Sequence, residues 1–163
     1  MTDAPAPGLT WIAKLALALI VILLAAGAIW HGLSFEVWQR MWGDLLDRPG
    51  GPMTFRFFLQ PIMAIIAAVI DGLKDARTGR SPYFWTVLTN PDKRAKRLNE
   101  GLVSTARIIL LGLIMDTIYQ ITVLKTFYPA EAANITIILA FIPYLLIRGP
   151  VARIARHWVH ASP

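Results

Sequence analysis

Polar side chains inside apolar stretches are the residues of this sequence that could carry chemistry. A bilayer offers them no water as a hydrogen-bond partner, so each of them needs either a protein partner or a function there. Asp116 and Gln120 lie four residues apart in one apolar run, so a helix places them on the same face. With a rise of about 1.5 Å per residue, Tyr144 in the next run lies at a similar depth and is expected to meet Asp116. Gln60 interrupts another run. These intramembrane polar residues predict either a proton or cation site or hydrogen bonds between helices.

We favour the hydrogen bonds, because a lone carboxylate with neither a second acid nor a lysine beside it makes a poor relay. A second polar feature is the combination of Asp71 and Arg107, which lie at similar depth in two apolar runs expected to be antiparallel. Opposite charges buried at the same depth are best explained as partners. The sequence therefore predicts a structural ion pair between Asp71 and Arg107.

Other kinds of chemistry have no motif to support them. The chain has no cysteine, and its three histidines, His31, His157 and His160, lie at the ends of apolar runs, so no thiolate site and no haem clamp is expected. The sequence contains no nucleophile elbow, phosphate loop, zinc-binding histidine pair or dinucleotide fingerprint. We therefore expect no enzymatic activity, no metal and no cofactor.

Four apolar runs must position these residues. With 163 residues, 56% of them hydrophobic, and a mean hydropathy of +0.54, the chain forms a single domain with the bilayer as its solvent. About 20 apolar residues span a bilayer as a helix, and the runs at 11–30, 55–73, 101–124 and 132–148 come near this length. The run at 55–73 is the weakest, because Gln60-Pro61 interrupts it and Asp71 lies near its end. It either spans or re-enters.

An amphipathic helix is predicted at 34–47, between the first two runs, with Ser34 as its N-cap. Its apolar face carries two tryptophans, Trp38 and Trp42, which anchor such a helix in the membrane interface. A short helix started by Ser81-Pro82 carries a third anchor, Trp85, and Asn90-Pro91-Asp92 starts a helix that continues into the third run. The predicted fold is therefore all-α, with four transmembrane helices and a periplasmic-side interfacial helix.

Basic residues set the predicted orientation. Seven of them lie in the segment 74–100 and three more near the end of the last run, and short cytoplasmic segments are rich in lysine and arginine. We expect both termini and the loop 74–100 in the cytoplasm; the alternative has three spans, an outside N-terminus and a re-entrant 55–73. Four bases at 93–97 are predicted to contact anionic lipid head groups rather than nucleic acid: Lys93, Arg94, Lys96 and Arg97.

Several short motifs from residue 55 onward resemble those of small bacterial inner-membrane proteins of no assigned activity. They are Arg80-Ser81-Pro82-Tyr83-Phe84-Trp85, Asp116-Thr117-Ile118-Tyr119-Gln120, Phe127-Tyr128-Pro129 and Arg148-Gly149-Pro150. The resemblance covers about the last two-thirds of the chain and implies a bacterial inner-membrane location, but it brings no catalytic residue with it.

Two functions are compatible with this pattern. The first is a non-catalytic accessory subunit or scaffold of a larger inner-membrane complex, with a membrane protein or further copies of the chain as its partner. The second is a small oligomeric transporter or proton/cation channel that uses Asp116 and Gln120, since four spans are too few for a monomeric carrier with inverted halves.

Overall fold

The computed structural model describes residues 9–32, 34–47, 50 and 54–159, and its regular elements are all helices. In chain order they are α1 (Trp11–His31), α2 (Phe35–Asp47), α3 (Phe55–Arg77), α4 (Tyr83–Thr89), α5 (Pro91–Tyr119), the π-helical turn η2 (Gln120–Leu124), α6 (Pro129–Thr136), the π-helical turn η3 (Ile137–Phe141) and α7 (Ile142–Val159). The all-α prediction is confirmed for the described part of the chain.

Four helices are long and apolar enough to cross a membrane: Trp11–His31, Phe57–Arg77, Pro91–Leu124 and Pro129–Trp158. By length and composition, this is a multi-pass membrane protein. The run at 55–73 forms one continuous helix of 23 residues with Pro61 inside it, so it does not turn back as a re-entrant loop. The third and fourth helices are both longer than their apolar runs, since they begin at Pro91 and at Pro129.

Local capping residues explain where several helices begin. Asn90 caps α5, with its side chain accepting a hydrogen bond from the backbone nitrogen of Lys93 at 3.2 Å, and Pro91 follows in the first turn, where its missing N–H costs nothing. Ser34 accepts from the nitrogen of Val37 at 3.4 Å at the start of α2. The predicted helix starts at Ser34, Ser81-Pro82 and Asn90-Pro91 are therefore confirmed.

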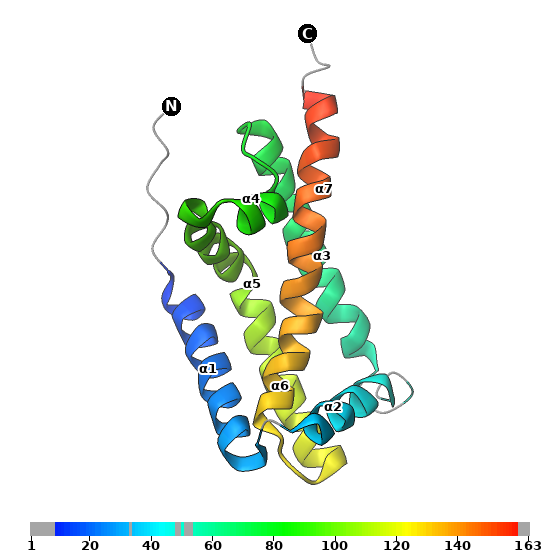
Figure 1. The fold of residues 1–163 in the computed structure, drawn as a ribbon. Helices are drawn as coiled ribbons and strands as arrows, with labels where there is room; N and C mark the ends of the chain where they lie inside the picture. Colours follow the sequence, from blue (N-terminus) through cyan, green and yellow to red (C-terminus); the bar gives the residue numbers. More distant parts are fainter. Residues whose placement is uncertain (1–8, 33, 48–49, 51–53, 160–163) are drawn as a thin grey trace.

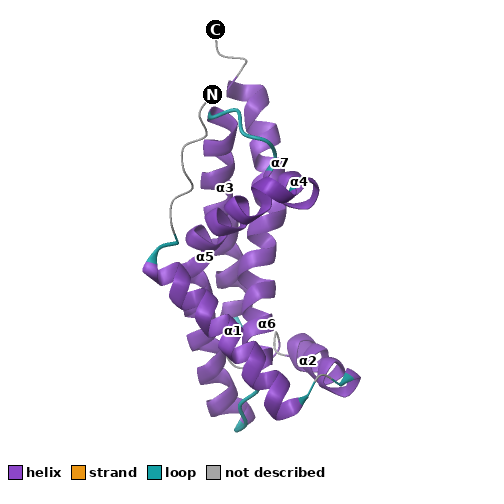
Figure 2. Cartoon of the chain, turned by 60° about the vertical axis from the view of Figure 1, so that its left-hand side comes forward, coloured by secondary structure: helices purple, strands orange, loops and turns teal. Residues whose placement is uncertain are grey.

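The four long helices form an elongated bundle (Figure 1) in which α3 and α7 make the most extensive contact. Helix α1 packs on α5 and α6. The two short helices cross the bundle toward opposite ends: α2 lies beside the start of α6, and α4 lies against α5 and α7 (Figures 1 and 2). The segment 74–100 is therefore mostly helical rather than a loop.

Small side chains fill the centre of the bundle. Ala64 and Ala68 of α3, Ala106 of α5 and Ala140 of η3 are almost fully buried. Gly72 approaches α7 so closely that an added Cβ would lie 2.9 Å from the backbone oxygen of Arg148. Helices in lipid gain little from the hydrophobic effect between them, so close packing of small residues is a main source of association.

Replacing Gly72 by alanine should therefore force α3 and α7 apart, because the new methyl group also meets Val151 Cγ1 at 2.9 Å. We expect a loss of about 1–3 kcal/mol in unfolding free energy, the usual cost of overpacking, measured by thermal unfolding in detergent. Gly43→Ala is the matched control, since a Cβ there meets nothing within 4 Å and alanine favours the helix. Equal melting temperatures for the two variants would contradict this account of the contact.

Candidate functional site

A network of buried charges joins α3 to α7. Four-residue spacing places Asp71 and Asp75 on one face of α3, and Tyr144 and Arg148 on the facing side of α7. Arg148 donates to both carboxylate oxygens of Asp75, from Nε at 2.8 Å and from Nη2 at 3.1 Å. Its Nη1 donates to the hydroxyl of Tyr144 at 2.7 Å, and that hydroxyl donates to Asp71 at 2.6 Å. The two helices run in the same direction, so Asp71 meets Tyr144 and Asp75, one turn further on, meets Arg148.

Helix α5 adds two more charges to this network. Arg97 Nη1 donates to Asp75 at 3.3 Å and to Glu100 at 3.2 Å, and Arg148 Nη2 also donates to Glu100 at 3.3 Å. Arg80, in the connection between α3 and α4, donates to Glu100 at 3.3 Å. We call these five residues the arginine–carboxylate cluster: Asp75, Arg80, Arg97, Glu100 and Arg148.

Two tyrosines enclose the cluster within the protein. Tyr83 is fully buried, and its hydroxyl donates to the backbone oxygen of Arg97 at 2.7 Å. The Arg148 guanidinium lies 4.4 Å from the centre of the Tyr83 ring, and the ring of Tyr144 meets that of Tyr83 edge-on. Burial raises the pKa of Tyr83 to about 12, against the opposing effect of Arg148. Tyr83 is therefore a neutral donor over the physiological range of pH.

Sequence reasoning missed this cluster, because Asp75, Glu100 and Arg148 lie at the ends of apolar runs, where charges are normally hydrated. The signal that could have found it is the repeated four-residue spacing of Asp71 with Asp75 and of Tyr144 with Arg148. Each buried charge is costly, and mutual pairing with good geometry offsets that cost.

The predicted ion pair between Asp71 and Arg107 is wrong. Asp71 accepts hydrogen bonds from Ser104 Oγ at 2.5 Å and from Tyr144, while Arg107 is exposed on the surface of α5. Among the described residues, no ion pair joins the two. Asp71 lies level with Ser104, one turn before Arg107, so two hydroxyls satisfy its carboxylate instead.

The four bases predicted at the lipid surface divide into two kinds. Arg97 is buried in the cluster, and Arg94 donates to the backbone oxygens of Val87 at 2.8 Å and Leu88 at 3.1 Å, at the end of α4. Both arginines therefore have structural roles, and Arg97 does not lie at the lipid surface. Lys93 is exposed and Lys96 is partly exposed, as a contact with head groups requires.

Asp116 and Gln120 form a hydrogen-bonded pair deep in the bundle. Both side chains are fully buried, and Gln120 Nε2 donates to Asp116 at 2.6 Å. The Gln120 amide also bonds the backbone of Tyr128, accepting from its nitrogen at 2.5 Å. The expected contact between Asp116 and Tyr144 is wrong, because the Tyr144 hydroxyl is bonded to Asp71 and Arg148 instead. Gln120 thus ties the end of α5 to the turn that precedes α6.

Gln60 lies elsewhere in the core, against Gly112 of α5 and Thr136 of α6. It is almost fully buried, yet neither its amide nitrogen nor its oxygen finds a hydrogen-bond partner among the described residues, and the same holds for the Thr136 hydroxyl. A Cβ at Gly112 would collide with the Gln60 amide, so glycine at this position makes room for it.

The polar residues of the core lie at two levels along the bundle. Gln60, Asp116 and Thr136 form one level, and Asp71, Ser104 and Tyr144 form the other. An apolar layer separates the two levels. On α3, Ala64 and Ala68 lie between Gln60 and Asp71, and on α5, Ile109 and Leu113 lie between Ser104 and Asp116. All four apolar side chains are buried. Ala140, also buried, occupies the corresponding place between Thr136 and Tyr144. Among the described side chains, no continuous polar line therefore connects Gln60 and Asp116 with Asp71.

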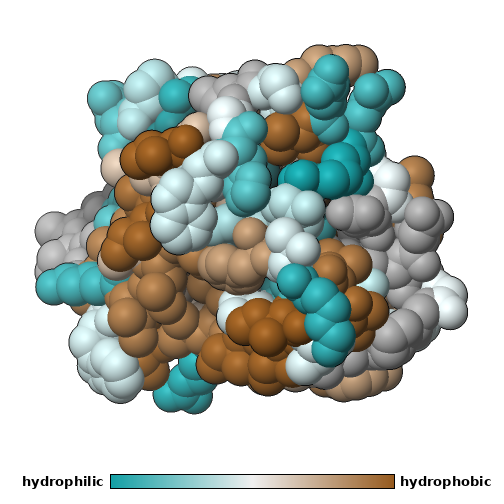
Figure 3. Space-filling view, turned by 90° about the horizontal axis from the view of Figure 1, so that it is seen from below, coloured by the Kyte–Doolittle hydropathy of each residue, from teal (hydrophilic) through white to brown (hydrophobic). Residues whose placement is uncertain are grey.

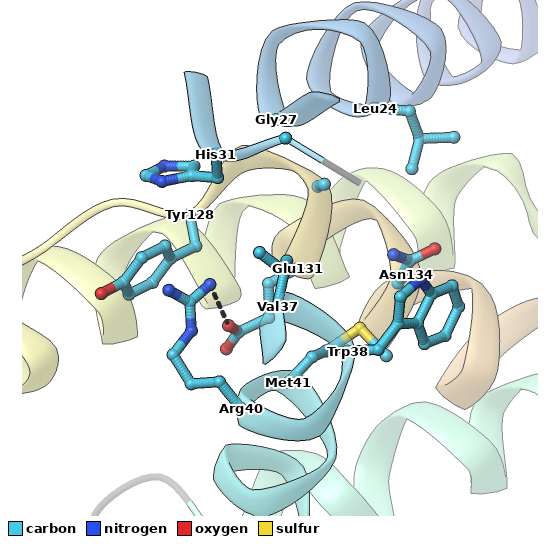
Figure 4. A pocket seen from close by; sticks show the side chains of 12 residues that line it. Leu24, Gly27, His31, Val37, Trp38, Arg40, Met41, Tyr128, Glu131 and Asn134 are labelled. Atoms are coloured by element: carbon cyan, nitrogen blue, oxygen red, sulfur yellow. Dashed lines mark ion pairs between the residues drawn. The ribbon is translucent and has the colours of Figure 1, made fainter. Parts of the chain in front are cut away.

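A cavity of about 190 Å³ lies between α1, α2 and the start of α6. Figure 4 shows Arg40 and Tyr128 on one side of it and Trp38 on the other. The Arg40 guanidinium lies 3.5 Å from the centre of the Tyr128 ring and 4.0 Å from Glu131 Oε2. These contacts attach α2 to α6 by a cation–π interaction and a long ion pair.

The three predicted interfacial anchors are at the surface. Trp38, Trp42 and Trp85 are each about half exposed, at 48%, 45% and 59%. Within the part of the chain that the structure describes, no group of three histidine, aspartate or glutamate side chains is placed to hold a metal ion.

Removing the central carboxylate of the cluster should destabilise the protein strongly. Asp75→Asn leaves Glu100 as the one carboxylate that Arg97 and Arg148 still share in a buried site, so we expect a loss of about 3–5 kcal/mol in unfolding free energy. Asp92→Asn removes the same charge from an exposed position in the first turn of α5 and should cost less than about 1 kcal/mol. Denaturant unfolding in detergent measures both, and similar costs would mean that the cluster is not a stabilising centre.

Comparison with known proteins gives no relative from which a role could be carried over. No protein-family model, curated protein or solved structure matches this chain. The resemblance to small bacterial inner-membrane proteins therefore stays a prediction, and the role of the site has to follow from its own geometry.

Proposed function

We propose that this chain is a non-catalytic subunit or scaffold of a larger complex in a bacterial inner membrane. The observation that carries the proposal is that each arginine of the arginine–carboxylate cluster is already paired with a carboxylate of the same chain. Arginine stays protonated in proteins, so such pairs do not release protons. A closed network of this kind fixes helices in place and leaves no acid or base poised for chemistry.

The apolar layer supports the same conclusion. A proton or cation path needs polar groups or water at short intervals, but Ala64, Ala68 and Leu113 separate Gln60 and Asp116 from Asp71. Gln60 and Asp71 are eleven positions apart on α3, which is about 16.5 Å of helix. A static packing role accounts for both polar levels without a connection between them.

The surface for a partner is best sought on α1 and α2. Helix α1 exposes Leu17, Val21 and Ile22 on its outer side, and α2 exposes Phe35 and Leu46. Seen from the end that carries α2, apolar side chains cover much of the surface, with hydrophilic ones scattered among them (Figure 3). Lipid or the helices of a partner would cover these faces, and the aromatic residues of α2 suit a location in the interface.

A small oligomeric transporter or channel is the second candidate, and one observation favours it. Gln60 and Thr136 carry unpartnered polar atoms in the core. The chain also departs from α-helix at η2, which begins at Gln120, and at η3, which directly follows Thr136. Turns of π-helix are frequent at functional sites. On this alternative, ions would move between copies of the chain past Asp116 and Gln120.

Purification from native membranes in a mild detergent, followed by native mass spectrometry, tests the scaffold directly. We expect a complex of fixed stoichiometry with another membrane protein. Asp116→Asn should preserve it, because an amide still accepts from Gln120, whereas Asp116→Leu should weaken helix association by about 1–2 kcal/mol. If reconstituted protein instead carries a proton or cation flux that Asp116→Asn abolishes, the transporter replaces the scaffold.

We further propose that both termini and the segment 74–100 lie in the cytoplasm, which puts α2 on the periplasmic side. The exposed bases Lys74, Arg77 and Arg153 at that end of the bundle support this orientation.

Reporter fusions after Gly50, Arg80, Ala130 and the last residue measure this orientation. They should report outside, inside, outside and inside respectively, because each intervening helix is long enough to cross the bilayer. If all four fusions report the opposite side of the membrane, the proposed orientation is wrong, although the four spans remain.

A further inference from the structure

A cleft of about 290 Å³ opens beside the arginine–carboxylate cluster, between the connection that follows α3, the side of α4 and the first turns of α5. All of its lining residues except Gly79 have polar or charged side chains. Four of its lining residues are basic, Arg80, Lys93, Lys96 and Arg97, and one, Glu100, is acidic. This cleft is distinct from the apolar cavity of Figure 4, which lies toward the end of the bundle that carries α2.

Basic side chains outnumber acidic ones in the lining of the cleft. The arginine–carboxylate cluster pairs three arginines with two carboxylates, Asp75 and Glu100. The next carboxylate, Asp71, lies one turn deeper along α3 and is bonded to two hydroxyls rather than to an arginine. The two carboxylates of the cluster are thus shared among three arginines, and Lys93 lies exposed at the mouth of the cleft.

Access to these charges is open from the surface. The Arg80 side chain is about one-third exposed, at 34%, although its guanidinium reaches Glu100. Ser81 and Lys93 are exposed as well. Arg94 holds the end of α4 against α5 through the carbonyls of Val87 and Leu88, so the wall of the cleft is fixed before any ligand arrives.

The same helix that walls the cleft places it at the depth of lipid head groups. Helix α4 crosses the bundle, and its outer side exposes Trp85 and Leu88, at 59% and 54%. Tryptophan at such a position favours the interface between head groups and acyl chains. A ligand in the cleft would thus have its charged group among bases while apolar surface lies beside it.

We propose that this cleft binds a phosphate group. A phosphate is the anion that several ammonium and guanidinium groups recognise together, with guanidinium supplying directed N–H donors and lysine a mobile charge. The phosphate comes either from a phospholipid in the surrounding leaflet or from a soluble phosphate compound, and the exposed apolar side of α4 favours the lipid. The proposal does not depend on whether the protein is a scaffold or a transporter.

Native mass spectrometry of the purified chain with phosphatidylglycerol or phosphatidylcholine tests the lipid source. The wild type should retain phosphatidylglycerol in preference to phosphatidylcholine, and Lys93→Gln/Lys96→Gln should weaken that retention by roughly tenfold or more, as expected for two lost contacts near a charged surface. Ser81→Glu, which places a negative charge in the cleft, should weaken it as well.

The matched control is Lys74→Gln/Arg153→Gln, which removes the same charge from exposed positions of α3 and α7 outside the cleft. It should change retention by less than about twofold, and circular dichroism should show that all variants fold. Titration with inorganic phosphate covers the soluble source: phosphate that raises the melting temperature of the wild type but not of Lys93→Gln/Lys96→Gln identifies a soluble ligand. If the control loses as much lipid as the cleft variant, or if neither probe distinguishes wild type from variant, the proposal fails.

Discussion

The rest of the structure depends on the two-point contact between Arg148 of α7 and Asp75 of α3. A guanidinium keeps its charge in a medium of low dielectric, so a carboxylate has to meet it with good geometry. Arg148 reaches Asp75 through Nε and Nη2, and its third nitrogen bonds Tyr144. These directed bonds leave little freedom for α7 to slide or rotate along α3, and Glu100 extends the same constraint to α5.

Once the register of α3 against α7 is set, small residues lie at the points where neighbouring helices approach most closely. Gly72 faces the Arg148 carbonyl, and Gly101 of α5 faces Tyr83 and the ring of Tyr144, where a Cβ would lie 3.1 Å from Tyr144 Cε1. The tyrosine rings can pack between α4, α5 and α7 only because this glycine has no side chain. Polar bonding and close packing thus act at the same places, as expected for helices that associate without help from the hydrophobic effect.

Sequence patterns predicted the helices well and their contacts poorly, for a physical reason. Hydropathy and capping are local, so the four spans and the start at Asn90-Pro91 could be read directly from neighbouring residues. Which residues lie level with one another depends on helix ends and rotation. The prediction that Asp71 meets Arg107 counted depth from residue 101, whereas α5 begins at Pro91 and α3 continues to Arg77. Arg148 looked like a hydrated residue at the end of a run, and only the packing of α3 on α7 shows it buried.

The π-helical turn η3 explains how Thr136 of α6 and Tyr144 of α7 can both face the core, although they lie at different levels of the bundle. In a regular helix, Thr136 and Tyr144 are eight residues apart and point about 80° away from each other. One π turn absorbs about one residue, which reduces that offset to about 20°. Pro143 supplies the cause, because it has no N–H to donate to the carbonyl of Leu139, and that carbonyl lies inside η3. Proline therefore turns both polar residues toward α3, and Ala140, on the turn between them, keeps an apolar side chain between the two levels.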